Sequence, residues 1–209
     1  MSLNAYQTIP GFLGPDINSQ LLDHCVTRES EFQQSTVGKT SRHDPSVRVS
    51  SILKDVGPFK ALIERRLLTI VPDLITELGV TPFTPAGLEM EVAAHGDGAF
   101  FQRHIDLFTG EERSKRFERL ISVVYYFHKE LKSFAGGSLR LYPQPGAAYR
   151  PDEPAIDITP QQDVAIAFSS WMAHEVLPVS CPSGRFSDSR FAINCWVLRD
   201  RSSVAHVEQ

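Results

Sequence analysis

The sequence has few cysteines, no basic block and no long hydrophobic run. Its three cysteines, Cys25, Cys181 and Cys195, are an odd number without a Cys-x-x-Cys pair, which excludes a disulfide framework and a cysteine-based zinc site. A reducing, cytoplasmic location is the simplest interpretation. The formal net charge of −4 at pH 7 is spread along the 209 residues. Because nucleic acids and anionic membranes require a basic surface, we expect neither as a partner.

No apolar segment approaches the ~20 residues that span a bilayer, and the first residues lack the pattern of a secretion signal. The sequence also shows no repeat at the period of a solenoid or a propeller. Its length fits one large domain better than two small ones. We therefore expect a single domain over residues 1–209.

The first part of the chain has a helical pattern. Over residues 1–80 the apolar residues mostly keep helical spacing, and Asp16 has the position of an N-cap. Pro72 fits the first turn of a further short helix. A polar stretch near residues 35–50 has turn residues and almost no apolar anchor. This stretch predicts a mobile loop between supporting helices.

From Gly87 onward the hydrophobic period falls to two, which is typical of β-strands. Short strands with long, partly Pro-rich connections and no alternating helices predict an antiparallel sandwich or barrel. We expect an α+β, mainly β fold, with this core over residues 87–198 and a tail over residues 199–209. After the strand at Gly87, the predicted strands cover residues 100–106, 120–127, 138–142, 164–168, 174–179 and 190–198.

Two histidines and an aspartate in the β region have the pattern of metal ligands. His104 and Asp106 lie two positions apart on a predicted strand, so their side chains share a face. Alone, this pair is more often a surface histidine beside a capping aspartate. His174, which lies between two apolar strands, favours the interpretation as metal ligands instead. Two histidines and one carboxylate form the facial arrangement that binds Fe(II) and leaves positions open. Zinc with an open position is the alternative.

Arg190 opens the last predicted strand and is charged at any physiological pH. A buried guanidinium needs a carboxylate to offset its desolvation, and no acidic residue nearby in the sequence shares its face. The guanidinium suits a ligand carboxylate in bidentate geometry, such as one end of a small dicarboxylic acid. A solvent-exposed arginine at the end of a strand is the alternative interpretation.

The order of these motifs over residues 87–198 resembles the Fe(II)/2-oxoglutarate-dependent dioxygenases, and within them the prolyl 4-hydroxylase-like subfamily. Several ordered motifs are much harder to obtain by chance than one. The motifs are His104-x-Asp106, Leu120-Ile-Ser-Val-Val-Tyr-Tyr-Phe127, Gly136-Gly-Ser-Leu-Arg-Leu-Tyr142, His174-Glu-Val-Leu-Pro-Val179 and Arg190-Phe-Ala-Ile-Asn-Cys-Trp196.

The resemblance implies a double-stranded β-helix, or jelly roll, with the metal between its two sheets and the N-terminal helices as support. It implies that His104, Asp106 and His174 ligate Fe(II). Arg190 would bind the distal carboxylate of the co-substrate 2-oxoglutarate, and Tyr126 would donate a hydrogen bond to the same group. The implied reaction consumes O2 and 2-oxoglutarate, releases succinate and CO2, and hydroxylates an unactivated C–H bond.

Two positions depart from the family pattern. Arg185 lies nearer to His174 than Arg190 does, at the more usual spacing, but the Phe-Ala-Ile-x-x-Trp context follows Arg190, which we prefer. His95 stands where relatives often carry a tyrosine close to the co-substrate. We interpret His95 as a hydrogen-bond donor there, with a structural turn histidine as the alternative.

The two-residue period of the strands adds further candidates. Ser122 shares the face of Tyr126, which makes it a candidate for the cofactor site and leaves Tyr125 to the core. Four residues are candidates for facing the substrate: Asn194, Trp196, Arg48 and Gln102.

The loop near residues 35–50 is interpreted as a lid over the site. Lys39, Arg42 and Arg48 give it a positive face that suits an acidic or carboxylate-bearing substrate. A flexible, solvated connection explains the same residues.

These residues predict an Fe(II)- and 2-oxoglutarate-dependent hydroxylase. Its expected substrate is an amino-acid-like small molecule or a peptidyl residue such as proline. Two alternatives stay open: a cupin-type metal-dependent enzyme that does not use 2-oxoglutarate, and a non-catalytic binding or sensing jelly roll. Arg190 and Tyr126 favour the first interpretation over a cupin-type enzyme, which would not need them. Retention of all three metal ligands argues against a simple binding domain.

Overall fold

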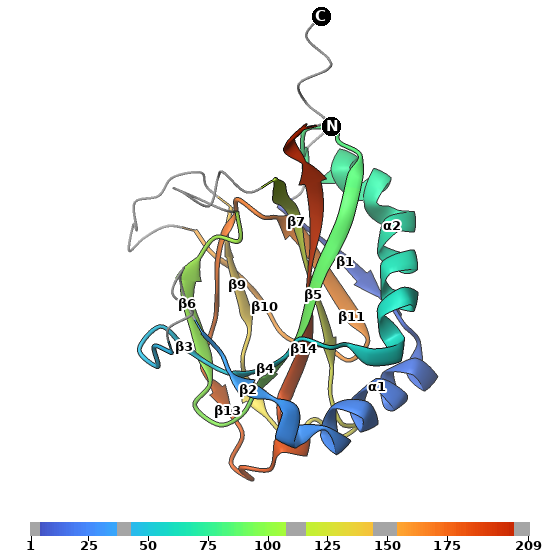
Figure 1. Cartoon of the computed structure of the whole chain (residues 1–209). Coiled ribbons are helices and arrows are strands. Elements are labelled where there is room, and N and C mark those ends of the chain that lie inside the picture. The colour runs from blue at the N-terminus through green and yellow to red at the C-terminus, as the bar shows by residue number, and fades with distance from the viewer. Residues whose placement is uncertain (1–4, 37–42, 108–115, 144–153, 203–209) are drawn as a thin grey trace, which may run out of the picture.

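Two antiparallel β-sheets face one another, and two helices cover the outer face of the larger sheet. The computed structural model describes residues 5–36, 43–107, 116–143 and 154–202. In Figure 1 the smaller sheet lies to the left of the larger sheet and the helices lie to its right. Within the described ranges, no helix combines the length and the apolar character needed to cross a membrane.

The larger sheet has the strand order β1-β11-β7-β14-β5-β4-β2, and the smaller sheet has the order β10-β9-β12-β6-β3. The larger sheet contains β1 (Tyr6–Pro10), β11 (Val164–Ser169), β7 (Phe117–Phe127), β14 (Arg190–Asp200), β5 (Pro85–His95), β4 (Ser51–Leu53) and β2 (Gln33–Gln34). The smaller sheet contains β10 (Ile156–Ile158), β9 (Leu139–Tyr142), β12 (Ala173–Val176), β6 (Phe100–His104) and β3 (Arg48–Val49). The remaining elements are β8 (Ala135–Gly136) paired with β13 (Val179–Ser180), the helices α1 (Pro15–Thr27) and α2 (Lys60–Glu77), and the 3-10 turns η1 (Glu29–Glu31), η2 (Gly57–Phe59) and η4 (Phe186–Asp188).

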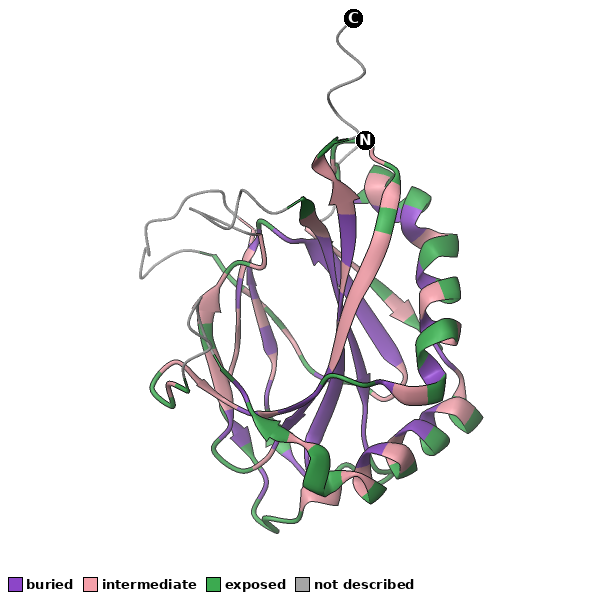
Figure 2. Cartoon of the chain, in the orientation of Figure 1, coloured by how far each residue is buried: buried purple, intermediate pink, exposed green. Residues whose placement is uncertain are grey.

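The long central strands serve two hydrophobic cores, because alternate side chains leave a strand on opposite faces. On β14, Phe191 and Ile193 pack toward the helices, whereas Ala192 packs toward the smaller sheet. On β7, Tyr125 belongs to the helix side and Tyr126 to the inner side, as the sequence predicts. These central strands are mostly buried in Figure 2, where the helices are buried along one stripe.

The helices depart from the sequence prediction at both proposed start signals. The N-cap of α1 is Gly14, and Asp16 lies inside the first turn, so the predicted N-cap is wrong. Pro72 does not begin a further helix but lies inside the continuous α2. A proline there leaves the carbonyl of the residue four positions earlier without its helical partner. Leu68, with 44% of its surface exposed, and the exposed Pro72 place this irregularity on the solvent-facing side of α2.

The strands predicted from Gly87 onward are all present, but residues 1–80 supply more strand than expected. β1 pairs with β11, and β4 pairs with β5, so this region adds strands to the larger sheet as well as helices. β10 lies in the Pro-rich connection between the strands predicted at residues 138–142 and 164–168, where no strand is expected. The predicted mobile loop near residues 35–50 is wrong at its end, because Arg48 lies in β3, which pairs with β6. Residues 37–42, including Lys39 and Arg42, lie outside the described residues.

The two sheets and their order confirm the predicted jelly roll. One hydrophobic cluster joins α1, α2 and the outer face of the larger sheet. A second cluster fills the space between the sheets toward β1 and β10. Polar residues of β5, β6, β7, β12 and β14 line a cavity between the sheets, which is where the candidate site lies.

Candidate active site

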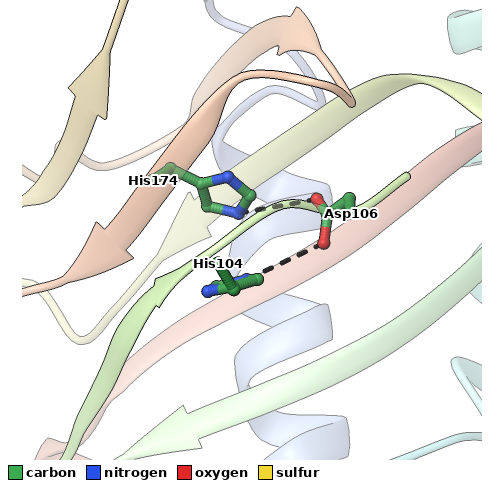
Figure 3. A group of neighbouring side chains, drawn as sticks. All are labelled: His104, Asp106 and His174. Atoms are coloured by element: carbon green, nitrogen blue, oxygen red, sulfur yellow. Dashed lines mark ion pairs between the residues drawn. The ribbon is translucent and has the colours of Figure 1, made fainter. Parts of the chain in front are cut away.

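Three potential metal ligands converge between the two sheets (Figure 3). His104 ends β6 and lies opposite His174 of β12 in the strand register. Asp106 follows two residues after β6, and its carboxylate oxygens lie 3.8 Å from Nε2 of His104 and 3.5 Å from Nε2 of His174. The ligand atoms of all three lie within 4.8 Å of one another. Among the described residues, no other group of three His, Cys, Asp or Glu comes together in this way.

Backbone contacts orient both imidazole rings. Nδ1 of His104 lies 2.8 Å from the carbonyl oxygen of Gln102, and Nδ1 of His174 lies 2.9 Å from that of Met172. A carbonyl can only accept, so each Nδ1 carries the proton and donates it. In a neutral ring the lone pair is then on Nε2, the atom that faces Asp106 in both residues. This second contact on the far nitrogen is typical of metal-binding histidines.

Hydroxyl groups of two serines fix the position of the Asp106 carboxylate. Its Oδ2 accepts a hydrogen bond of 2.7 Å from Oγ of Ser122, which itself lies 2.9 Å from Oγ of Ser170. Burial alone would raise the pKa of Asp106, but His174, His104, Ser122 and Trp196 together hold it below its ordinary value. The carboxylate is therefore ionised, as a metal ligand must be.

Burial keeps His104 neutral. It lowers the pKa of His104 to about 3, and the neighbouring His174 acts in the same direction. A neutral imidazole has a lone pair available for a cation at neutral pH. Two imidazoles and one carboxylate, with hard nitrogen and oxygen donors, fit one divalent transition-metal ion and leave coordination positions open.

A buried arginine lies at the other end of the same inner face. Arg190 has 1% of its surface exposed, and Nε donates a 2.7 Å hydrogen bond to the carbonyl of Gly137. Its guanidinium carbon lies 4.9 Å from the centre of the Tyr126 ring, and Nη1 lies 3.4 Å from Nδ1 of His95. No carboxylate of the described residues forms an ion pair with it. Burial lowers the pKa of Arg190 from its ordinary value.

Three buried polar atoms around Arg190 have no hydrogen-bond partner among the described residues. They are Nη2 of Arg190, Oη of Tyr126 and Nε2 of His95. Burial raises the pKa of Tyr126, and burial with the nearby arginines holds the pKa of His95 well below its usual range. Tyr126 therefore keeps its proton, and His95 is neutral. Buried polar groups without partners are rare, and a bound carboxylate would satisfy these.

Gly137 makes room for the arginine. A Cβ atom at this position would lie 2.7 Å from Cδ of Arg190 and 2.8 Å from Cγ2 of Val179, closer than packed atoms come. Its φ of 66° is also one that side chains rarely adopt. Only glycine lets the chain pass this close to Arg190.

One cavity of about 430 Å³ connects the three potential ligands with Arg190. Most candidates from the sequence contribute to its wall, namely Ser122, Asn194, Trp196 and Arg48. Gln102 does not, because its side chain donates a hydrogen bond to the carbonyl of Ser46. Tyr126 and His95 contact Arg190 without lining the main cavity.

The model of the 2OG-Fe(II) oxygenase superfamily matches residues 90–198. The chain belongs to this superfamily. It is also 33% identical over 197 residues to an uncharacterised PKHD-type hydroxylase of Synechocystis sp.. That match covers 93% of this chain and 63% of the relative, so the chain spans less than two thirds of the relative's length.

Solved structures share the fold of this chain. A prolyl-4-hydroxylase from Pseudomonas putida matches with a TM-score of 0.65 and 24% identity over 93% of each chain. A prolyl hydroxylase from Trichoplax adhaerens, in complex with a hypoxia inducible factor peptide fragment, matches with a TM-score of 0.64 and 23% identity. This match covers 99% of the present chain and 88% of the other. The predicted family and fold are confirmed, and Fe(II), 2-oxoglutarate and O2 are the cofactors that the superfamily uses.

The sequence offers two arginines as the residue that binds a ligand carboxylate, and they differ in environment. The Arg185 side chain is 68% exposed and already binds Oδ2 of Asp188 at 2.8 Å. Arg190 is buried in the cavity wall and has no such partner among the described residues. The geometry therefore favours Arg190 as the residue that meets a ligand.

The main cavity also contains charged residues that the sequence analysis did not single out. Glu91 and Arg119 line it, together with the aromatic ring of Phe101, which stacks on His104 at 3.7 Å between ring centres. Glu91 lies on β5 with the same parity as His95, so the two-residue period alone could have found it. Phe101 lies three residues from His104, and the register shift between β6 and β12 prevents parity from placing it.

Proposed function

We propose that this protein is an Fe(II)- and 2-oxoglutarate-dependent hydroxylase of an amino-acid-like small molecule or a peptidyl residue. The observation that carries the proposal is the single cavity that joins three convergent metal ligands to a buried arginine without a carboxylate partner among the described residues. A cupin-type enzyme or a simple binding domain would not need both features.

The roles of the residues follow from their donor atoms. His104, Asp106 and His174 hold Fe(II), and Arg190 binds the distal carboxylate of 2-oxoglutarate. Tyr126 and His95 donate to the same carboxylate from their unpartnered atoms. With O2, the bound iron and 2-oxoglutarate supply an oxidising power that protein side chains lack.

The chain orients these groups and limits access of water. Val124, Leu139 and Val176 give the cavity an apolar wall. Such a wall strengthens the charge interactions inside and protects a reactive site from side reactions.

The comparisons support a small-molecule or peptide substrate, since one solved relative is in complex with a peptide fragment. The free, buried state of all three cysteines fits the proposed reducing, cytoplasmic location. The hydrophobic cluster shared by the helices and the larger sheet supports the proposal that residues 1–209 form one domain.

Anaerobic titration with Fe(II) and 2-oxoglutarate tests the proposal through the weak visible charge-transfer band of the ternary complex. We expect the band in the unaltered protein, and succinate release once O2 is admitted. Arg190→Ala should weaken 2-oxoglutarate binding by about 100-fold, because a buried charged contact is lost. Arg185→Ala is the matched control and should leave binding unchanged. Absence of both the band and succinate would overturn the proposal.

A further inference from the structure

A second pair of opposite charges, separate from the metal ligands and from Arg190, lies in the wall of the main cavity. Nη2 of Arg48 and Oε1 of Glu91 are 3.3 Å apart, and the two side chains are only 11% and 20% exposed. Both residues line the same cavity as His104 and His174. Charges held this far from water are costly unless other groups compensate them fully.

The fold fixes both charges in place. Glu91 lies on the inner face of β5, directly opposite Asn194 of β14. Arg48 is the first residue of β3. Two residues later, at Ser50, the chain crosses from the smaller sheet to the larger one. Nε of Arg48 donates a 3.0 Å hydrogen bond to Oγ of Ser50, and its guanidinium lies 4.6 Å from the centre of the Phe101 ring.

The pair makes longer contacts than the bidentate ion pair between Arg140 and Asp157. Oε1 of Glu91 receives only long contacts, 3.3 Å from Arg48 and 3.5 Å from Nδ2 of Asn194. No hydrogen bond between described residues uses Oε2 of Glu91 or Nη1 of Arg48, and neither is among the fully buried atoms without a partner, so both can be reached by a ligand. By contrast, the more exposed Arg140 makes bidentate contacts of 2.6 and 2.7 Å with Asp157. An ion pair built only to join β3 to β5 would be expected to close in this way.

The charges of the cavity indicate what would complete the pair. Under the proposed function, Arg190 binds the carboxylate of 2-oxoglutarate and Asp106 is a ligand of the metal. Arg119, the other charged residue in the wall, contacts Glu89 at 2.5 Å and stacks over Trp196. What is left is one cationic and one anionic group side by side, with no net charge.

We propose that Arg48 and Glu91 bind the carboxylate and the ammonium group of a free α-amino acid, so that the substrate is zwitterionic. The ammonium and carboxylate groups of an α-amino acid are attached to the same carbon. Their close spacing matches two adjacent protein charges of opposite sign. A residue within a peptide carries neither charge and would leave both groups unsatisfied. This inference rests on the proposed function and selects one of its two substrate classes.

A substrate screen tests the inference directly. Each of the free L-amino acids that occur in proteins is compared with its N-acetyl and its C-amide derivative and with a proline-containing peptide. The readouts are succinate release above the substrate-free background and the anaerobic shift of the Fe(II)/2-oxoglutarate band. We expect at least one free amino acid to be active, and blocking either end to lower kcat/KM by about 10- to 100-fold, the value of a charge-assisted hydrogen bond.

Variants assign each end of the substrate to one residue. Glu91→Gln should remove the preference for a free over an acetylated amino group, and Arg48→Gln should remove the preference for a free over an amidated carboxyl group. Arg28→Gln, in an exposed ion pair with Glu31 at the end of α1, is the matched control and should change neither preference. The charge-reversed double variant Arg48→Glu with Glu91→Arg keeps an ion pair but reverses it. It should still form the band and lose amino-acid turnover.

Several outcomes would overturn the inference. Equal activity of free and blocked forms, activity on the peptide alone, or full activity of the charge-reversed variant would show that the pair only joins the sheets. A protein that forms the band but accepts none of the free amino acids would also refute it. Failure of the proposed function is distinguishable, because the band would then be missing in the unaltered protein without any substrate.

Discussion

The two ends of the main cavity are built in opposite ways. At the metal end the far nitrogen of each histidine and an oxygen of Asp106 have fixed partners, so the three donors are held in position. At the Arg190 end, three buried polar atoms have none among the described residues. A metal site needs rigid donors because coordination geometry is strict, whereas a co-substrate site must leave its donors free for a ligand that comes and goes.

The largest effect should come from the metal end. Asp106→Ala removes the charged ligand and leaves only the two imidazoles, so Fe(II) binding and succinate release should fall below detection. Equilibrium dialysis of Fe(II) under anaerobic conditions measures the loss. His43→Ala, which changes an exposed histidine, is the control and should bind normally. Retained iron binding in the Asp106 variant would remove the carboxylate from the proposed ligand set.

A second prediction uses the close packing at the other end. Gly137→Ala places a Cβ against Arg190, in addition to the strain of a positive φ. We expect the free energy of unfolding to fall by about 3 kcal/mol and 2-oxoglutarate affinity to fall by about 10- to 100-fold, because Arg190 must move. Chemical denaturation and titration of the charge-transfer band measure the two effects.

Gly184→Ala separates the two causes. Gly184 has a φ of 62°, but no atom lies within 4 Å of the place that its Cβ would take, so the substitution adds strain without a clash. It should cost about 1 kcal/mol and leave 2-oxoglutarate binding unchanged. Equal affinities in the two variants would mean that Arg190 does not need its present position.

The partner behind Asp106 should have a smaller effect. Ser122→Ala removes the hydrogen bond to Oδ2 but keeps all three ligands. Fe(II) affinity should fall by about 10-fold, as is typical when a contact that orients a ligand is lost. Anaerobic dialysis checks this value, with Ser133→Ala as the control, since the Ser133 hydroxyl donates to a nearby backbone carbonyl far from the ligands. An unchanged affinity would show that the other contacts of Asp106 suffice.

The sequence predicts most of what depends on local pattern. The two-residue period separates Tyr126 from Tyr125 and Arg190 from Phe191, because side-chain direction in a strand alternates strictly. It also places His104 beside Asp106. These inferences need no knowledge of how distant segments meet.

What the sequence misses depends on contacts between distant segments. β1 exists because it pairs with β11, far along the chain, and nothing within β1 specifies that partner. Arg48 meets Glu91 only because the chain changes sheets at Ser50. The sequence analysis places Pro72 at the start of a helix, whereas it lies inside α2. Whether a helix tolerates an internal proline depends on which of its faces meets solvent, and tertiary packing decides that.

The smallest predicted effect concerns the acid stability of the Arg190 end. His95 is buried beside Arg190, and its pKa lies well below 6.5, so the folded protein excludes a proton that the unfolded chain takes up. The stability that this provides is present above pH 6.5 and is lost as the pH falls below that value. Between about pH 7.5 and about pH 5.5 the metal-free protein should therefore lose about 1 kcal/mol through His95.

His95→Gln isolates this contribution, since glutamine keeps a hydrogen-bond donor but does not titrate. Its free energy of unfolding, from chemical denaturation at the two pH values, should fall by about 1 kcal/mol less than that of the unaltered protein. His43→Gln, at an exposed position, should not change the difference. If the variant and the unaltered protein lost the same stability, His95 would take up its proton in the folded state. The Arg190 end would then hold two cations, His95 and Arg190, side by side without a ligand. His95 would not be the neutral hydrogen-bond donor that we propose for the co-substrate site.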